Sequence, residues 1–491
     1  MPNVTVLPHG RILAAQTGDS LYQLLFREGL SPAAPCGGTG KCGKCIVTVN
    51  GLSRKACETQ IHGDMTVELP ETVDMRILAE GEDRYLAWDP PVPGYAAAID
   101  LGTTTLCCYL LDKTGGHEMV SRSAANPQRA AGADVVSRIR AAAQGHLEEL
   151  TLLLRDAVNT LLLECCREAE VKPREIRLIS VVGNPAMQQF FLGLAVDNLI
   201  QLPYLPVLTR AELIDGRDYL PEFSDALIMV VPDISAYVGA DTLGCILACG
   251  MQEMKQTVLL VDIGTNGEMV LCHRGRMLAC AAAAGPALEG ADISCGITAR
   301  PGAVDRVWVN NGVLCSHVIG EGTPLGICGS GLIDAAAAAL ELGLVNSRGK
   351  LMTDQLEIAG GVRLNQEDIR ALQLAKGAIR AGIELLCDRM GISVNEIDEV
   401  LLAGAFGSYL NPRSACRIGL LPRMPEGKIR PAGNAAGSGA KLLCRSRDAY
   451  RSLDTLASGV EPLDLGAQKD FPRAFARGMR FPDPKDLEES E

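Results

Sequence analysis

Two short stretches share one pattern, Asp100-Leu-Gly-Thr-Thr-Thr105 and Asp262-Ile-Gly-Thr-Asn-Gly267. Each follows one apolar run and precedes a second, so each is expected to be the turn between two buried strands. The copies lie far apart, at a spacing typical of whole domains rather than of a short repeat. Each copy continues into further strands and then a helix, expected at 147–168 in the first copy and 369–386 in the second. The pattern therefore predicts two homologous α/β lobes.

Such a turn carries a definite chemistry. A strand that delivers an aspartate into a Gly-Thr turn places amide and hydroxyl donors beside phosphate oxygens, and a carboxylate beside a magnesium ion. One turn of this kind is a common hairpin and by itself is weak evidence for phosphate binding. Two copies in matching strand contexts predict that a nucleotide lies in a cleft between the lobes.

Composition limits the function classes. The chain has 491 residues, of which 47% are hydrophobic and 21% charged, enough for about two or three cores. Its formal net charge of −13 argues against binding to duplex nucleic acid or to an anionic membrane. The longest uncharged stretch, 178–196, carries Asn184, Pro185 and Gln188 and is not expected to span a membrane. The first ten residues lack a signal-peptide pattern, so the expected location is the cytoplasm.

Four of the 18 cysteines form a cluster with the spacing Cys36-x5-Cys42-x2-Cys45-x11-Cys57. Disulfides do not persist in a reducing compartment, so the cluster indicates a metal centre. The glycines of Gly37-Gly-Thr-Gly-Lys41 let the backbone wrap closely around bridging sulfides, which favours a [2Fe–2S] cluster. A structural zinc site is the alternative, although zinc ribbons normally use two Cys-x2-Cys knuckles and only one exists here. A P-loop is excluded because Cys42 follows Lys41 where Ser or Thr is needed.

The remaining cysteines are scattered as singles and doublets. Cys107-Cys108 lies in an apolar strand pattern and Cys165-Cys166 in a helical one. Both doublets, and Cys328 in a glycine-rich turn, are expected to be small packing residues.

The start of the chain reads as a small α+β module. A hairpin pattern at 4–14 is followed by a helix, the cysteine loop, and short strands at 46–49 and 65–69. Asp89-Pro-Pro-Val-Pro93 is a stiff extended stretch and marks the clearest boundary. The predicted segments are a ferredoxin-like domain at 1–74, a linker at 75–94, a first lobe at 95–254, a second lobe at 255–450 and a C-terminal tail at 451–491.

The cysteine segment resembles the ferredoxin-like modules of the β-grasp fold. The likeness rests on Cys36-Gly-Gly-Thr-Gly-Lys-Cys-Gly-Lys-Cys45 and Lys55-Ala-Cys-Glu-Thr-Gln60. It implies that Cys36, Cys42, Cys45 and Cys57 bind the [2Fe–2S] cluster. The chain departs from those modules in having only eleven residues before the fourth cysteine, so Cys57 would come from a shortened hairpin.

The paired turns are similar to those of the superfamily of actin, heat-shock chaperones and sugar kinases, a two-lobed ATPase fold related to ribonuclease H. Within it the chain most resembles the reductive activators of corrinoid proteins, which join an amino-terminal [2Fe–2S] module to this fold. Almost the whole chain takes part. The matching stretches are 126–134, 182–187, 237–241, 284–290, 326–331, 403–407 and 433–436, besides the two turns.

The resemblance implies a role for each matching residue. Asp100 and Asp262 would be the carboxylates that orient magnesium and phosphate. The phosphate cradle would consist of the turn residues Gly102, Thr103, Thr104, Gly264, Thr265 and Asn266. Small residues let the adenine base pack closely, so the adenosine side would be formed by Gly404, Phe406 and Gly407.

Two further carboxylates, Asp241 and Glu268, are the candidates for orienting the attacking water. From the residues alone, a helix cap at Asp241 and a solvated strand end at Glu268 remain equally open. At Pro185 the family often has a hydroxyl residue, so no contact is carried over from that position.

The resemblance implies one task for the two modules. A corrinoid protein of a methyltransferase system, of the O-demethylase or acetyl-CoA pathway type, is inactive as Co(II) and would be returned to Co(I) by one electron from the [2Fe–2S] cluster, driven by ATP with Mg²⁺. The partners would be that corrinoid protein and a low-potential electron donor, and a homodimer is expected from the resemblance alone.

Three other functions remain open. One is an ATPase that activates a radical dehydratase or reductase, although such activators resemble chains with a [4Fe–4S] cluster shared between two subunits and no separate ferredoxin module. Another is a redox-sensing electron carrier with a nucleotide switch. The third is a small-molecule kinase, for which the sequence names no substrate.

Overall fold

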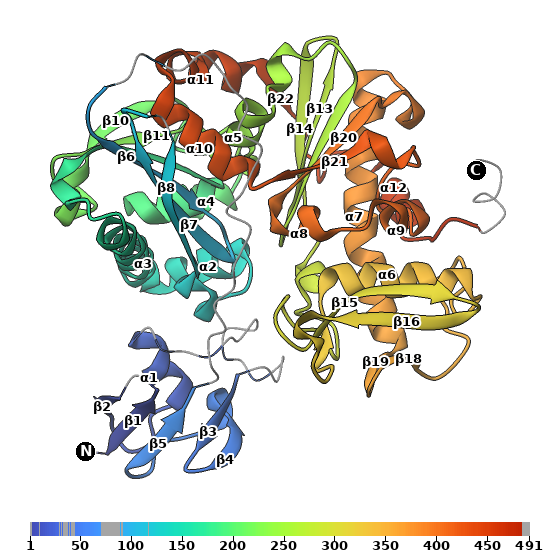
Figure 1. Cartoon of the computed structure of the whole chain (residues 1–491), viewed down its shortest axis with the longest axis horizontal. Helices are drawn as coiled ribbons and strands as arrows, with labels where there is room; N and C mark the ends of the chain where they lie inside the picture. Colours follow the sequence, from blue (N-terminus) through green and yellow to red (C-terminus); the bar gives the residue numbers. More distant parts are fainter. Residues whose placement is uncertain are drawn as a thin grey trace.

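The computed structural model describes residues 2–8, 10–28, 30, 32, 38, 40, 45–69, 89, 92–115 and 117–483. The chain forms an amino-terminal module and two larger lobes that stand side by side (Figure 1). Among the described residues, no helix combines the length and apolarity needed to cross a membrane.

The amino-terminal module is a five-stranded mixed sheet with one helix. Its elements are β1 (Asn3–Leu7), β2 (Arg11–Ala14), α1 (Leu21–Arg27), β3 (Ile46–Val49), β4 (Leu52–Lys55) and β5 (Met65–Glu68), in the sheet order β2-β1-β5-β3-β4. The hairpin lies where the sequence predicts it, with Val4 opposite Leu13. Helix α1 buries Leu21 and Leu25 completely against the sheet. Strand β4, which has no buried residue, was not predicted because it lacks an apolar alternation.

The first lobe is built on a six-stranded sheet. Its strands are β6 (Tyr95–Leu101), β7 (Thr105–Asp112), β8 (Glu118–Ala125), β9 (Ile176–Gly183), β10 (Glu212–Asp215) and β11 (Leu227–Val230), in the order β10-β11-β9-β6-β7-β8. Its helices are α2 (Val135–Ala141), α3 (Leu147–Glu168), α4 (Pro185–Leu192) and α5 (Ala240–Cys249). Helix α3 has the bounds that the sequence predicts. Both cysteine doublets are buried, one in β7 and one in α3, as expected for packing residues.

The second lobe repeats five strands of this topology, and its sixth strand, β22, lies at the other edge of the sheet. Strands β12 (Val258–Ile263), β13 (Gly267–His273), β14 (Arg276–Ala282), β20 (Glu399–Ala403), β21 (Ile429–Gly433) and β22 (Val460–Pro462) form a sheet in the order β21-β20-β12-β13-β14-β22. In each lobe the strand that carries the aspartate, β6 or β12, pairs antiparallel with the next strand and parallel with a later one, β9 or β20. The repeat predicted from the two turns is therefore confirmed.

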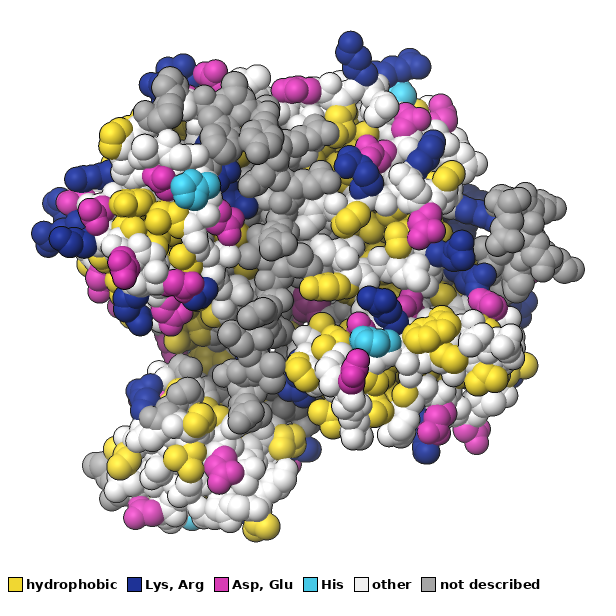
Figure 2. Space-filling view, in the orientation of Figure 1, with side chains coloured by type: hydrophobic (Ala, Val, Ile, Leu, Met, Phe, Trp, Pro, Cys, Tyr) yellow, Lys and Arg dark blue, Asp and Glu magenta, His cyan; other side chains and the backbone are white. Residues whose placement is uncertain are grey.

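Additional elements extend the second lobe. They are β15 (Ala303–Asn310), β16 (Val313–Val318), β17 (Gly326–Ile327), α6 (Gly329–Glu341), β18 (Leu356–Ala359), β19 (Val362–Leu364), α7 (Gln366–Met390), α8 (Gly404–Tyr409) and α9 (Pro412–Arg417). Hydrophobic side chains gather on the surface of the part that carries β15 and β16, where Trp308 and Val313 are exposed (Figure 2). Elsewhere on this face basic and acidic side chains are interspersed.

The last part of the chain completes both lobes. Helix α10 (Ala435–Arg445) lies on the sheet of the first lobe, where Ser180 Oγ donates to the Ala440 carbonyl at 2.6 Å. Helix α11 (Arg447–Gly459) follows, and β22 then adds to the sheet of the second lobe. Helix α12 (Phe471–Gly478) packs on α7, where Gln373 Nε2 donates to the Met479 carbonyl at 2.8 Å. The segment 451–491 was expected to be a C-terminal tail, but its described part contributes strand β22 and the packed helix α12.

Helices α5 and α10 form a layer between the two sheets. One apolar cluster joins Ala96 and Ala98 of β6, residues of both helices, and Val258 and Leu260 of β12. The opposite faces of the two sheets are covered by α3 in the first lobe and by α6 and α7 in the second. The aspartate-bearing strands of the two lobes therefore share one packed layer.

The crossing of α5 and α10 depends on two glycines. A Cβ atom on Gly439 would lie 2.2 Å from the Gly244 carbonyl oxygen and 2.4 Å from its Cα, both backbone atoms that cannot rotate away. We therefore expect Gly439→Ala to cost about 3 kcal/mol or more and to lower the thermal midpoint by roughly 10 °C. Gly459→Ala, at the end of α11 with no atom within 4 Å, is the matched control and should leave the midpoint unchanged or slightly raised. Equal midpoints would contradict this account of the crossing.

Candidate functional site

The two predicted phosphate turns meet between the lobes. Thr104 Oγ1 of the first turn lies 3.3 Å from Thr265 Oγ1 of the second. Each turn follows its aspartate-bearing strand, and each aspartate lies beside the end of the parallel neighbour, with Asp100 opposite Val182 and Asp262 opposite Ala403. Residues far apart in the chain are thus brought to one place by the packing of the lobes.

The first turn is braced from behind by three polar side chains. Asn126 Nδ2 donates to the Gly102 carbonyl at 2.9 Å, and Arg138 Nη2 donates to the Thr103 carbonyl at 2.6 Å. Asn184 Nδ2 donates to Thr103 Oγ1 at 2.9 Å. Because that hydroxyl oxygen is already an acceptor, its hydrogen can point toward a phosphate oxygen. A Cβ on Gly102 would meet the Thr105 carbonyl at 2.3 Å, so no other residue fits this turn.

The second turn is closed by its own backbone. Gly264 N donates to the Asn266 carbonyl at 2.9 Å, and the side chain of Asn266 approaches Glu268. Glu268 lies directly opposite Asp262 on the antiparallel strand β13. The predicted cradle residues of both turns therefore lie at one site.

Four carboxyl groups gather beside the turns. Burial raises the pKa of Asp100 and of Asp241 to about 7 and the pKa of Asp262 to about 6. Burial also raises the pKa of Glu268 well above its usual value, and the charges of Asp241 and Asp262 raise it further. A cation bound beside these four carboxyl groups would stabilise their ionised forms.

Among the described residues, no three His, Cys, Asp or Glu side chains are close enough together to hold a metal ion by themselves. Phosphate oxygens and water would have to complete the shell of a magnesium ion at the carboxylates. Magnesium is usually bound in this way, through one or two carboxylates and the substrate phosphates. Asp100 and Asp262 are the carboxylates at the ends of the two strands and fit this part.

Asp241 is not a helix cap, and Glu268 is not at a solvated strand end. Asp241 is in the first turn of α5, where its Oδ1 accepts from Thr242 N at 2.7 Å. Helix α5 has Gly239 as its N-cap residue, so Asp241 is not the cap. Glu268 is half-buried and feels the charges of Asp241 and Asp262. Both side chains therefore belong to the acidic group beside the turns.

The acidic group predicts a pH dependence of stability. The folded-state pKa values of Asp100, Asp241 and Asp262 lie above the unfolded value of 3.8, so the folded protein binds more protons between pH 4 and 7. Their stabilising contribution is complete below pH 4 and is lost as the pH rises through 6 to 7. Asp100→Asn removes one of the groups that cause this decrease in stability. We therefore expect the thermal midpoint of the variant to fall a few degrees less between pH 5 and pH 8 than that of the unchanged protein. Parallel curves for the two proteins would contradict the assignment.

Of the three residues predicted for the adenosine side, Gly404 lies next to the second turn. Gly404 has φ +81°, and a Cβ there would lie 2.5 Å from Asp262 Oδ1. The Phe406 ring packs at the start of α6, 2.5 Å from where a Cβ on Gly329 would be, and Gly407 packs against the backbone of Leu402. Gly404 thus joins the site directly, whereas Gly407 permits close packing of α8 on its own strand.

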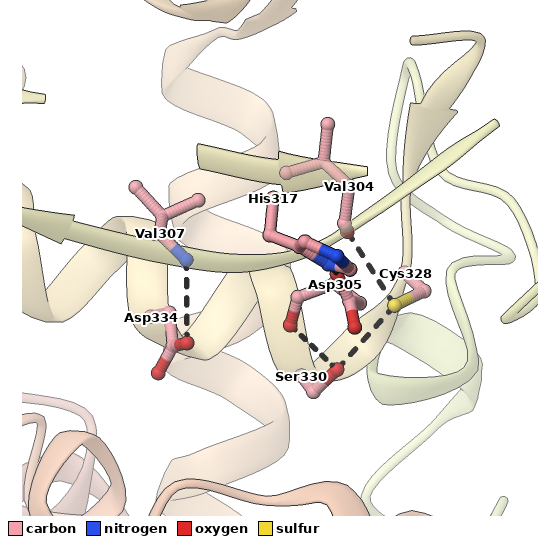
Figure 3. Close-up of polar contacts among 7 residues, drawn as sticks. All are labelled: Val304, Asp305, Val307, His317, Cys328, Ser330 and Asp334. Carbon is pink, nitrogen blue, oxygen red and sulfur yellow. Dashed lines mark hydrogen bonds and ion pairs between the residues drawn. The ribbon is translucent and has the colours of Figure 1, made fainter. Parts of the chain in front are cut away.

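Cys328 lies at the start of α6 (Figure 3). Its thiol is buried, donates to the Val304 carbonyl at 3.4 Å and lies 3.4 Å from Ser330 Oγ. Ser330 Oγ in turn donates to the Asp305 carbonyl at 3.0 Å. These contacts tie α6 to β15, which agrees with the packing role expected for this cysteine.

Several residues at the site were not assigned roles from sequence. Asn434 Nδ2 donates to both Asp100 Oδ2 and Tyr109 Oη at 2.9 Å, while its Oδ1 accepts from Gly437 N and caps α10. Glu289 accepts hydrogen bonds from both Thr104 and Thr265. Asn126, Asn434 and Glu289 lie in stretches that carry the family likeness, and the available signal was a polar side chain beside a glycine for Asn434 and Glu289 and before a proline for Asn126. Arg138, the largest fully buried side chain, had no such signal.

The predicted iron–sulfur ligands are described only in part. Cys36 and Cys42 lie outside the described residues. Cys45 Sγ and Cys57 Sγ lie 3.1 Å apart, farther than the ~2.05 Å of a disulfide bond. Two sulfurs bound to one tetrahedral metal at about 2.3 Å lie about 3.8 Å apart. A small separation of the two thiols would therefore place both within bonding distance of one metal ion.

Comparisons with known proteins agree with this arrangement. Residues 95–254 match the RACo middle region, and residues 256–490 match the C-terminal domain of RACo, the ASKHA domain. The corrinoid activation enzyme RamQ of Eubacterium limosum is 31% identical over 422 residues, 80% of this chain and 71% of that protein. The [Co(II) methylated amine-specific corrinoid protein] reductase of Methanosarcina barkeri is 28% identical over 381 residues, 70% of this chain and 68% of that protein. The solved structure of a reductive activator for corrinoid, iron–sulfur protein covers 100% of both chains with a TM-score of 0.74 and 25% identity.

Proposed function

The chain belongs to the RACo family, the reductive activators of corrinoid proteins, and from this membership we propose that it uses ATP to drive one-electron reduction of a corrinoid protein from inactive Co(II) to Co(I). The output supports a corrinoid-dependent methyltransferase. The relatives named for corrinoid activation and for Co(II) corrinoid protein reduction support the same reaction.

One observation supports the ATPase half of the proposal most strongly. The hydroxyls of Thr104 and Thr265, from two homologous turns in two lobes, lie 3.3 Å apart beside Asp100 and Asp262. Hydroxyl and amide donors on both sides with carboxylates behind them suit a triphosphate and its magnesium ion. Asn434 would hold Asp100 in place, and Gly404, which has no side chain, would let the backbone at the start of α8 lie against Asp262.

The electron-transfer half is assigned to the amino-terminal module. Cys45 and Cys57, with Cys36 and Cys42, are the proposed cluster ligands. A [2Fe–2S] cluster bound there would supply a one-electron centre, with a potential near about −400 mV in plant-type modules. An external low-potential donor would reload it.

The module contacts the nucleotide lobe close to the first turn. Tyr22 of α1 donates its hydroxyl hydrogen to the Ala130 carbonyl at 2.8 Å. Ala130 ends the short helix η2 (Pro127–Ala130), and the residue before that helix, Asn126, holds the Gly102 carbonyl. Two hydrogen-bonded steps thus separate the module from the phosphate turn. This proximity supports the assignment of both halves to one reaction.

ATP has a thermodynamic task in this scheme. Each ~59 mV of uphill one-electron transfer costs a factor of ten in equilibrium, about 1.4 kcal/mol. A nucleotide can offset that cost only if it changes how tightly the partner's Co(II) and Co(I) states are held. Movement of the lobes when ATP binds and is hydrolysed would provide such a difference.

The proposal is tested anaerobically. Purified protein, a low-potential electron donor and a Co(II) corrinoid protein are mixed, and the Co(I) absorption band is followed with and without ATP. We expect Co(I) to accumulate only with ATP. Equal accumulation without ATP would reject the energy coupling, and the absence of Co(I) with every corrinoid protein supplied would reject the activity.

A further inference from the structure

A glutamate connects the two phosphate turns. Glu289 ends the short helix η9 (Pro286–Glu289), and its carboxylate accepts from Thr104 Oγ1 at 3.2 and 3.3 Å and from Thr265 Oγ1 at 3.0 Å. Thr104 belongs to the first lobe and Thr265 to the second. One carboxylate therefore joins the hydroxyls of both turns.

The backbone around Glu289 is tightly constrained. Gly290 has φ +77°, and a Cβ on it would lie 2.7 Å from the Ile297 carbonyl oxygen. Gly290 N donates to the Ala287 carbonyl at 3.0 Å, and Ala291 N donates to the Pro286 carbonyl at 3.1 Å. A short helix closed at its end by glycine thus aims the Glu289 side chain at the turns. The charge of the buried Arg138, which also holds the first turn, attracts the carboxylate.

A carboxylate and a phosphate compete for the same donors. Both are anionic acceptors that form short, charge-assisted hydrogen bonds with hydroxyl groups. Thr104 and Thr265 each have one hydroxyl hydrogen, and both hydroxyls lie within hydrogen-bond distance of the Glu289 carboxylate. With their oxygens 3.3 Å apart, a phosphate group does not fit between them unless Glu289 leaves and the turns separate.

We propose that Glu289 is an internal competitor for the triphosphate, which holds Thr104 and Thr265 together through their hydroxyl groups and is displaced from them when phosphates bind. This inference rests on the proposed function, because it takes both threonines as phosphate ligands. Departure of phosphate lets the carboxylate return and rejoin the lobes. Through this exchange, Glu289 determines how far the Thr104 and Thr265 turns separate when a nucleotide binds.

The test compares nucleotide affinities of Glu289→Gln and the unchanged protein by calorimetry with Mg²⁺–ATP and, separately, with adenosine. Glutamine keeps the shape, but its neutral amide forms weaker hydrogen bonds with the two hydroxyls and does not repel phosphate. We expect ATP to bind on the order of 10- to 100-fold more tightly, while the affinity for adenosine stays unchanged. Glu253→Gln removes the same charge at an exposed position of the short helix Met251–Glu253 and should leave both affinities unchanged.

The outcomes separate this inference from the proposed function. Equal ATP affinities of Glu289→Gln and the unchanged protein, or an equal gain for adenosine, would overturn the competition alone. Absence of ATP binding to the unchanged protein would overturn both. Slower ATP hydrolysis at unchanged ATP affinity would make Glu289 a catalytic group and would also overturn the competition. Glu289→Ala, checked for folding by its thermal midpoint, provides a second variant and should bind ATP more tightly in the same way.

Discussion

Asp262→Ala will abolish ATP-dependent formation of Co(I) while leaving the visible absorption of the iron–sulfur centre intact. Asp262 is the next-to-last residue of strand β12, beside the second turn, opposite Glu268 and against Gly404. In the proposed mechanism Asp262 positions the magnesium ion, and without it the ion would no longer be held where it offsets the negative charge that develops on the phosphates. We expect the ATP-dependent rate to fall by a factor on the order of 10² to 10³.

Loss of folding will not explain that result. Burial raises the pKa of Asp262 to about 6, so the ionised carboxylate destabilises the folded protein above that pH. The alanine variant should therefore keep its thermal midpoint at pH 8. Asp156→Ala, on the exposed surface of α3, removes the same group away from the site and should keep full activity. An Asp262→Ala protein that still needs ATP and still forms Co(I) at the full rate would contradict the assignment.

Cys45→Ser and Cys57→Ser will have the opposite phenotype. Each should lose the visible absorption of the iron–sulfur centre and all electron delivery to the corrinoid protein, while ATP still binds between the lobes. The reason is that the two thiols lie only 3.1 Å apart, within reach of one metal ion, and oxygen is a poor substitute for a thiolate at such a centre. The same loss is expected for Cys36 and Cys42.

The measurements are the visible spectrum of anaerobically prepared protein, its iron and sulfide content, and ATP binding by calorimetry. Cys315→Ser, a half-buried thiol in β16, is the matched control and should retain the cluster. Zinc in place of iron, or an unchanged spectrum in Cys45→Ser, would contradict the [2Fe–2S] assignment. Together with Asp262→Ala, these variants separate electron delivery from ATP use.

Much of this site follows from short-range patterns. The apolar runs around Asp100 and Asp262 predict buried strands, and the Gly-Thr steps after them predict turns with phosphate donors. Helix α3 has its predicted bounds because a long amphipathic stretch carries its own periodicity. Strands β4 and β22 were not predicted, since one is fully outside the core and the other is three residues long.

The two lobes, the turns, the aspartates and the cysteine spacing could be predicted from the sequence alone. Each is a property of one contiguous stretch, whose periodicity or ligand pattern does not depend on residues far away in the chain. Only the tertiary structure decided that Asn434 holds Asp100, that α10 lies on the sheet of the first lobe, and that Glu289 joins Thr104 to Thr265. Those pairings arise when helices α5 and α10 pack between the two sheets. Their partners are brought together by that packing, and no local pattern encodes it.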